Sequence, residues 1–301
     1  MARRDLLGVP AEDDLSRVTD GPIVRKLLSG QQADGGFGVH PYHKWTGAHW
    51  RLVSLVELEA PAIDPRLGAA LDTVLDWLAD PRYQGTSRRR ADGVILSHAS
   101  MEGNALAVAC RLGRADDPRA SLLAERLVEW QWPDGGWNCD RGASGRRSSF
   151  HETLCAIWGL HEYASATGHT SAAAAARRGA ELLLDHRLFR RHGTGEPIHR
   201  MWVKLRYPAY WHYGILQALH VLRRMGLAAD PRASDALDIV AERRAADGKW
   251  AAEGYWWSPP GSGKYAPEVV DWGRRQPNPM LTLNALRVLK AAGRPPDGVA
   301  R

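Results

Sequence analysis

Three histidines and a glutamate lie at comparable positions near the start of four apolar segments. They are His49, Glu102, His151 and His212, and a fifth apolar segment has Thr282 at the corresponding place. If these segments are helices facing one cavity, the four polar side chains would form a ring at one level. Such a ring could transfer protons near neutral pH, or could bind a divalent metal such as zinc or iron. Proton transfer is favoured because no two of the residues share a helix at metal-binding spacing. A local structural role for each histidine is the alternative.

The densest polar stretch of the chain runs from residue 139 to residue 153. Asp140 is expected at the mouth of the cavity, where an apolar environment would raise its pKa and let it protonate an alkene or epoxide. Glu152 could do the same, although a carboxylate in a first helical turn also suits the helix dipole. Arg146 and Arg147 could hold a carboxylate or diphosphate beside a helix N-terminus. The candidate catalytic residues are therefore Asp140, His151, Glu152, His212, His49 and Glu102.

Tryptophan is unusually common, with 13 residues against three phenylalanines. Each electron-rich ring can stabilise a cation by about 0.5–2 kcal/mol. Filling a large core is the alternative role, and it would account for roughly half of these rings. The aromatic loop at 255–263 could be a lid or an entrance that faces a membrane. The candidate substrate-binding rings are Trp45, Trp50, Trp158, Trp211, Tyr213, Trp256 and Trp257.

The segments that must position these side chains are predicted to be helices. Asp-Pro-Arg occurs at 64–66, 117–119 and 230–232, where Asp can cap a helix and Pro can occupy its first position. Asp-Gly turns separate amphipathic helices from helices that are apolar on most sides. Outer helices are expected at 17–31, 67–78, 119–131 and 232–245, and inner helices at 45–59, 98–112, 150–166, 209–225 and 279–292. This pattern predicts an all-α toroid of five to six helical hairpins. It would be a single domain over 1–301, with a core at about 15–293 and flexible tails at both ends.

One repeated element resembles a known family. Gln131-Trp132-Pro133-Asp134-Gly135-Gly136-Trp137, with a weaker copy at 32–37, resembles the Gln-Trp repeat of squalene and hopene cyclases and of protein prenyltransferase β subunits. The resemblance implies the α/α toroid and structural roles for Gln131 and Trp137. The chain lacks the Asp-x-Asp-Asp acid motif of type II cyclases; its nearest strings are 12–14 and 116–117. It also lacks the Asp-x-Cys zinc motif of the prenyltransferases, because Cys139 here precedes Asp140.

Composition excludes several classes of protein. The net charge is +6, but the arginine pairs are dispersed along the chain, so nucleic-acid binding is not expected. Three cysteines argue against a disulfide framework and for a reducing compartment, which predicts a cytoplasmic protein. The N-terminus lacks the apolar segment of a signal peptide, and no stretch approaches the length of a membrane span.

The favoured hypothesis is an enzyme of isomerase or lyase class. It would cyclise or rearrange an isoprenoid or other apolar substrate by acid initiation, with Asp140 or Glu152 as the acid and His151 and His212 as a proton relay. One alternative is a lyase or metal-dependent enzyme that uses the ring of His49, Glu102, His151 and His212. Another is a non-catalytic toroid that binds a lipid or a protein. No cofactor is expected beyond that divalent metal, peripheral membrane contact stays open, and the sequence indicates no oligomeric state.

Overall fold

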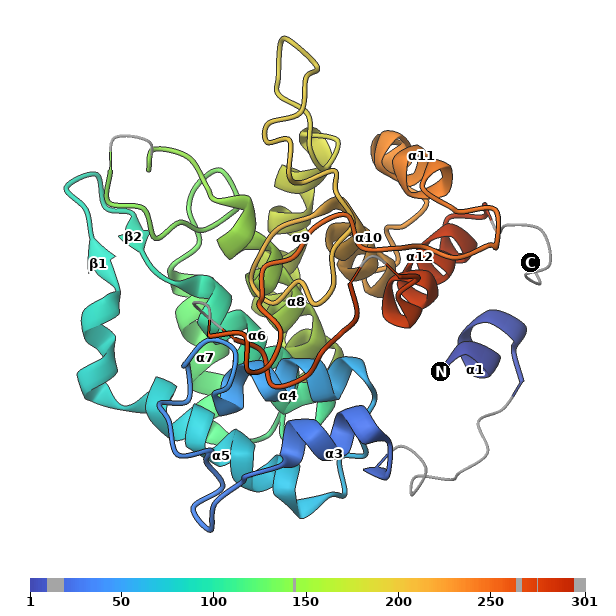
Figure 1. Ribbon diagram of the computed structural model, residues 1–301. Helices are drawn as coiled ribbons and strands as arrows, with labels where there is room; N and C mark the ends of the chain where they lie inside the picture. Colours follow the sequence, from blue (N-terminus) through green and yellow to red (C-terminus); the bar gives the residue numbers. More distant parts are fainter. Residues whose placement is uncertain (10–18, 143–144, 264–266, 275, 295–301) are drawn as a thin grey trace. The chain divides into compact units, whose positions relative to one another are not determined.

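The computed structural model describes residues 1–9, 19–142, 145–263, 267–274 and 276–294. These residues fold mainly into α-helices, which confirms the predicted all-α class (Figure 1). Two short strands, β1 (Arg88–Arg89) and β2 (Ile95–Leu96), pair antiparallel about the Asp92-Gly93 turn. None of the described helices combines the length and apolar composition needed to cross a bilayer.

The chain divides into two compact units, each built from segments far apart in the sequence. The larger unit comprises Leu15–Gly179 and Trp257–Asp271; the smaller comprises Met1–Asp14, Ala180–Trp256 and Trp272–Arg301. One boundary falls inside helix α9 (Thr170–Asp185), so no linker joins the units there. The single domain over 1–301 and its closure into a toroid remain predictions.

Helices of the larger unit fall into the two predicted types. The apolar helices α4, α6 and α8 are buried on nearly all sides of their first turns, and α6 contacts both α4 and α8. By contrast, α5 and α7 bury one face only, because their apolar residues recur with helical spacing. The unit contains α3 (Pro22–Leu28), α4 (Ala48–Glu57), α5 (Pro65–Ala79), α6 (Ala99–Arg111), α7 (Pro118–Glu129), α8 (Phe150–Thr167) and the 3-10 helix η1 (Pro81–Thr86).

The Asp-Pro-Arg tripeptides start helices as predicted. Asp64, Asp117 and Asp230 each accept a hydrogen bond from the backbone N–H of the arginine two residues later. The arginine side chain also pairs with the same carboxylate, and its hydrogen bonds hold the pKa of Asp64 and Asp117 below the ordinary value. The third copy begins the 3-10 helix η2 (Pro231–Ala233) ahead of α11 (Ser234–Glu242). A fourth copy that the sequence reading missed, at 80–82, begins only η1.

The Gln-Trp element braces one turn against two helices. The Gln131 side-chain amide donates to the carbonyls of Gly135 and Ala175, at 2.7 and 2.8 Å. Trp137 is fully buried, and its indole N–H donates to the Leu127 carbonyl at 2.9 Å. The turn is thereby fixed to both α7 and α9, which fits the structural roles that the resemblance implies.

The weaker copy of this element is shifted by one residue from its predicted alignment. Gln31, not Gln32, donates to the carbonyls of Gly35 and Arg66, at 2.9 and 2.8 Å. It therefore occupies the place of Gln131. Both glutamines stand three residues before the Asp of the turn, so a stricter count in the sequence would have found this register.

Helices of the smaller unit are α1 (Ala2–Leu7), α10 (Ile215–Arg224), α11 and α12 (Pro279–Ala291). The prediction that α10 starts at residue 209 is wrong, because residues 207–213 are not helical and the extended Gly214 is the N-cap. Residues 2–7, which the sequence assigns to a flexible tail, instead form α1. Arg287 of α12 pairs with Asp5, and Lys290 donates to the Leu6 carbonyl at 2.8 Å. Residues 295–301 lie outside the described part.

The backbones of α6 and α8 come into close contact at two glycines. A Cβ atom on Gly103 would lie 2.3 Å from the carbonyl oxygen of Cys155, and one on Gly159 would lie 2.3 Å from that of Gly103. No side chain larger than hydrogen fits at either place without displacing backbone. The small residues around them, mainly alanine, allow the same close approach along α6.

Gly103→Ala should therefore destabilise the protein by about 1–3 kcal/mol, because overpacking displaces well-packed helices. The matched control is Gly68→Ala in the interior of α5, where a Cβ would meet nothing within 4 Å. That variant should be neutral or more stable by about 0.5–1 kcal/mol, since alanine is the better helix former. Chemical denaturation measures both. Equal stability of the two variants would contradict the proposed close contact.

Candidate functional site

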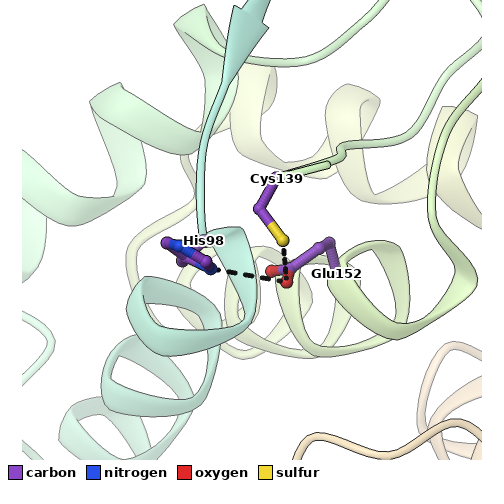
Figure 2. Close-up of side chains that lie close together, drawn as sticks. All are labelled: His98, Cys139 and Glu152. Carbon is purple, nitrogen blue, oxygen red and sulfur yellow. Dashed lines mark hydrogen bonds and ion pairs between the residues drawn. The ribbon is translucent and has the colours of Figure 1, made fainter. Parts of the chain in front are cut away.

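Three segments of the larger unit bring His98, Cys139 and Glu152 together (Figure 2). His98 is the N-cap residue of α6, Cys139 follows the Trp137 turn, and Glu152 lies in the first turn of α8. The Cys139 thiol donates to Glu152 Oε1 at 3.2 Å, and His98 Nδ1 lies 3.9 Å from the same oxygen. Among the residues that the structure describes, this is the one group of three or more His, Cys, Asp or Glu whose ligand atoms lie within 4.8 Å of one another.

Backbone hydrogen bonds hold the three segments in place. Ser100 N–H donates to Glu152 Oε2 at 2.7 Å, so the second carboxylate oxygen is anchored to the start of α6. Ser97 N–H donates to the Asn138 carbonyl at 2.9 Å, which joins the residue before His98 to the residue before Cys139. The Asn138 side chain donates to the Arg147 carbonyl at 2.7 Å and so closes the loop that leads to α8.

Burial keeps the Cys139 thiol protonated at neutral pH. It raises the pKa of this thiol to about 12, and the nearby charge of Glu152 acts in the same direction. Glu152 itself is only 4% exposed. The thiol therefore acts as a hydrogen-bond donor to Glu152.

Glu102 is a second buried carboxyl group, one helical turn after His98. It is 1% exposed, and its Oε2 has no hydrogen-bond partner among the described residues. Its pKa is raised to about 8, mainly by burial and also by the nearby charge of Glu152, while Arg126 has the opposite effect. Glu102 thus carries a proton at neutral pH in an apolar part of the protein.

His49, in the first turn of α4, is surrounded by aromatic rings from several segments. Its ring contacts Tyr42, Trp50 and Trp77, with centroid distances of 5.9, 4.6 and 6.2 Å. Trp45 packs edge-on against Trp50 at 5.0 Å. Neither ring nitrogen of His49 has a hydrogen-bond partner among the described residues, and burial lowers its pKa to about 3. His49 is therefore neutral across the physiological range.

The predicted metal set does not match the group that the structure brings together. His49, Glu102 and His151 belong to the larger unit, but their ligand atoms form no such group among the described residues. His151 is half-buried on α8. His212 belongs to the smaller unit and precedes α10, because that helix begins at Ile215. The equal register inferred from four inner helices is therefore wrong for His212.

Asp140, Arg146 and Arg147 are exposed, which removes the apolar environment expected around Asp140. Asp140 Oδ1 accepts the Gly142 N–H at 2.8 Å, as in a loop turn. The acidic residues 12–14 lie outside the described part. The sequence prediction did not include His98, although it is the first residue of the helix predicted at 98–112, and it set Cys139 aside because its neighbours did not match a zinc motif. The signal available in the sequence was that His98 and Glu152 lie at the starts of two predicted helices, with Cys139 shortly before the second helix.

The remaining candidate rings are mostly packed into the core. Trp158 is 5% exposed and its indole N–H donates to Glu162 at 3.1 Å; Trp257 is 4% exposed. Tyr213 is 1% exposed and its hydroxyl donates to the Leu188 carbonyl at 2.6 Å. All three side chains are buried, and their role in binding a substrate remains a prediction.

In the smaller unit, His212 is stacked between two indoles. The ring centroid of Trp211 lies 4.0 Å away at 22°, and that of Trp256 lies 3.9 Å away at 4°. The Arg206 guanidinium lies over the Trp256 ring, 4.2 Å from its centroid. This arrangement places the Arg206 cation against an electron-rich indole face, a combination that favours cation–π attraction.

Comparisons with known proteins leave the family open. No protein-family model matches the chain, and no curated protein matches it. Among solved structures, the type II terpene cyclase MstE from Scytonema, without ligand, aligns over 95% of this chain and 100% of its own. The identity is 12% and the TM-score is 0.33. At these values the similarity establishes neither a shared fold nor a shared activity.

The raised pKa of Glu102 predicts how stability depends on pH. The folded protein keeps this proton up to a pKa of about 8, whereas the unfolded chain loses it near the ordinary value of 4.5. Between these values the folded state binds more protons, so the free energy of unfolding should fall as pH rises. Glu102→Gln removes this titration and should lose less stability than the wild type from pH 5 to pH 8. Denaturation midpoints across that interval test this, with Glu125→Gln on the exposed face of α7 as the control. Identical pH profiles for Glu102→Gln and wild type would disprove the assignment.

Proposed function

We propose that the protein is a terpene cyclase-like enzyme that transforms an isoprenoid or other apolar substrate by acid initiation. The observation that supports this is Glu102, a carboxyl group that stays protonated at neutral pH because it is buried. Glu102 was predicted as a member of the polar ring and not as the acid. It is better suited to be the acid than Asp140, which is exposed, and than Glu152, which already accepts two hydrogen bonds. The enzyme would belong to the isomerase or lyase class.

The proposed first step moves the Glu102 proton to a carbon of a substrate double bond. The π electron pair forms the new C–H bond, a carbocation is left on the neighbouring carbon, and Glu102 becomes a carboxylate. A second double bond of the substrate then supplies the electrons for ring closure. A neighbouring C–H bond finally gives its electron pair to a new double bond, its proton passes to water, and Glu102 regains a proton from solvent. A buried acid with a pKa near the working pH is suited to this role.

Aromatic side chains near the acid would stabilise the cation. Helix α4 packs against α6, and it carries Trp50, with Trp45 just before it. Together with Tyr42 and Trp77, these rings surround the neutral His49. Each ring face contributes about 0.5–2 kcal/mol to binding a positive charge. This proposal includes the arrangement of the helices as a closed toroid around a central substrate cavity.

The proposal also covers the cellular compartment of the enzyme and the route by which its substrate enters. None of the three cysteines is in a disulfide, which fits a reducing compartment such as the cytoplasm. The substrate would be a small apolar molecule, and the loop at 255–263 would be its entrance at a membrane surface.

A metal-dependent enzyme is the second candidate function. The observation that favours it is the group of His98, Cys139 and Glu152, not the ring first predicted.

Glu102→Gln should lower turnover at least ~100-fold, because general-acid catalysis contributes about 10²–10⁴ in rate. The assay incubates the protein with linear polyprenyl alcohols, diphosphates and epoxides and measures cyclised or rearranged products by mass spectrometry. Glu125→Gln, an exposed carboxyl group on α7, should keep wild-type turnover. Full turnover by Glu102→Gln with an active substrate would refute the role of Glu102 as the acid.

A further inference from the structure

We propose that His98, Cys139 and Glu152 bind a zinc ion through three protein ligands, with a fourth position left for water or a substrate oxygen. The ligand atoms are His98 Nδ1, Cys139 Sγ and a carboxylate oxygen of Glu152 (Figure 2). This inference goes beyond the proposed function, since it requires neither Glu102 nor an apolar substrate.

The spacing of the three atoms fits a tetrahedral ion. Zinc bonds of about 2.0–2.3 Å imply ligand–ligand separations of roughly 3.4–3.6 Å. Cys139 Sγ lies 3.2 Å and His98 Nδ1 lies 3.9 Å from Glu152 Oε1, and all three ligand atoms are within 4.8 Å of one another. Side-chain shifts of a few tenths of an ångström up to about one ångström would complete the geometry.

The donor set selects the metal. A sulfur, an imidazole nitrogen and a carboxylate oxygen together suit zinc, whereas magnesium and calcium require oxygen ligands. Binding would replace the Cys139 S–H bond by a Zn–S bond and release that proton to solvent. Three protein ligands and one open position are the arrangement of catalytic rather than structural zinc sites.

The site is held by a second layer of hydrogen bonds before any metal binds. Glu152 Oε2 is anchored by Ser100 N–H, and the Ser97–Asn138 backbone bond keeps His98 and Cys139 side by side. Such outer contacts orient metal ligands and are part of what gives a site its affinity. A chance contact of three flexible side chains would lack this support.

Solvent reaches the group from one side. The His98 side chain is 42% exposed, whereas the Glu152 side chain is 6% exposed. A metal ion could therefore enter past His98, and the fourth position would face the same side.

Cobalt binding to the full-length, metal-stripped protein tests the site without any substrate. Titration with Co²⁺ should show one equivalent bound, a thiolate-to-cobalt band in the near ultraviolet and the strong visible bands of a tetrahedral ion. Zinc should displace the cobalt and raise the melting temperature, because it binds the folded state. Binding of no stoichiometric metal at micromolar free zinc would overturn the proposal.

Matched variants identify the ligands. Cys139→Ser should abolish the near-ultraviolet band and weaken zinc at least ~100-fold, while Cys110→Ser, a half-buried cysteine on α6, should behave as wild type. His98→Gln changes a partly exposed side chain, so it should fold normally and still lose affinity at least ~10-fold. An unchanged cobalt spectrum in Cys139→Ser would refute the site. Because no turnover is measured, this result is independent of whether Glu102 is the acid.

Discussion

The direct contact between the backbones of α6 and α8 is the constraint on which the rest of the larger unit depends. Gly103 and Gly159 leave no space for a side chain between the two helices. Water is excluded along this contact, so polar groups beside it are buried unless the protein supplies partners. Glu102 and Glu152 lie on these two helices and are buried, at 1% and 4% exposed.

The two carboxyl groups have different surroundings although they share this helix pair. Glu152 accepts hydrogen bonds from Ser100 N–H and from the Cys139 thiol. Glu102 Oε2 has no hydrogen-bond partner in the described residues, and burial raises the pKa of Glu102 to about 8. Such a difference between neighbouring carboxyl groups is what lets one donate a proton while the other binds a cation. The proposed acid and the proposed zinc ligand are distinguished in this way.

The repeated Gln-Trp element connects this chemistry to the framework. Gln131 and Trp137 fix a turn between α7 and α9, and Cys139 follows that turn by two residues. Backbone bonds from Ser149 N–H to the Trp137 carbonyl, and from Trp137 N–H to Thr153 Oγ1, then fix the turn to α8. A structural motif therefore determines where the thiol of the proposed zinc site lies.

The sequence by itself determined the helices and their burial, because these depend on short-range interactions. Asp-Pro-Arg capping and apolar periodicity depend on neighbouring residues, and they placed α5, α7 and the buried α6 correctly. Only the tertiary structure decided which side chains meet. The group of His98, Cys139 and Glu152 depends on a turn, a helix N-cap and a first helical turn that local patterns do not bring together. Likewise, the exposure of Asp140 and the place of His212 before α10 depend on loop conformation. Loops lack the regular hydrogen bonding that makes helices readable from sequence.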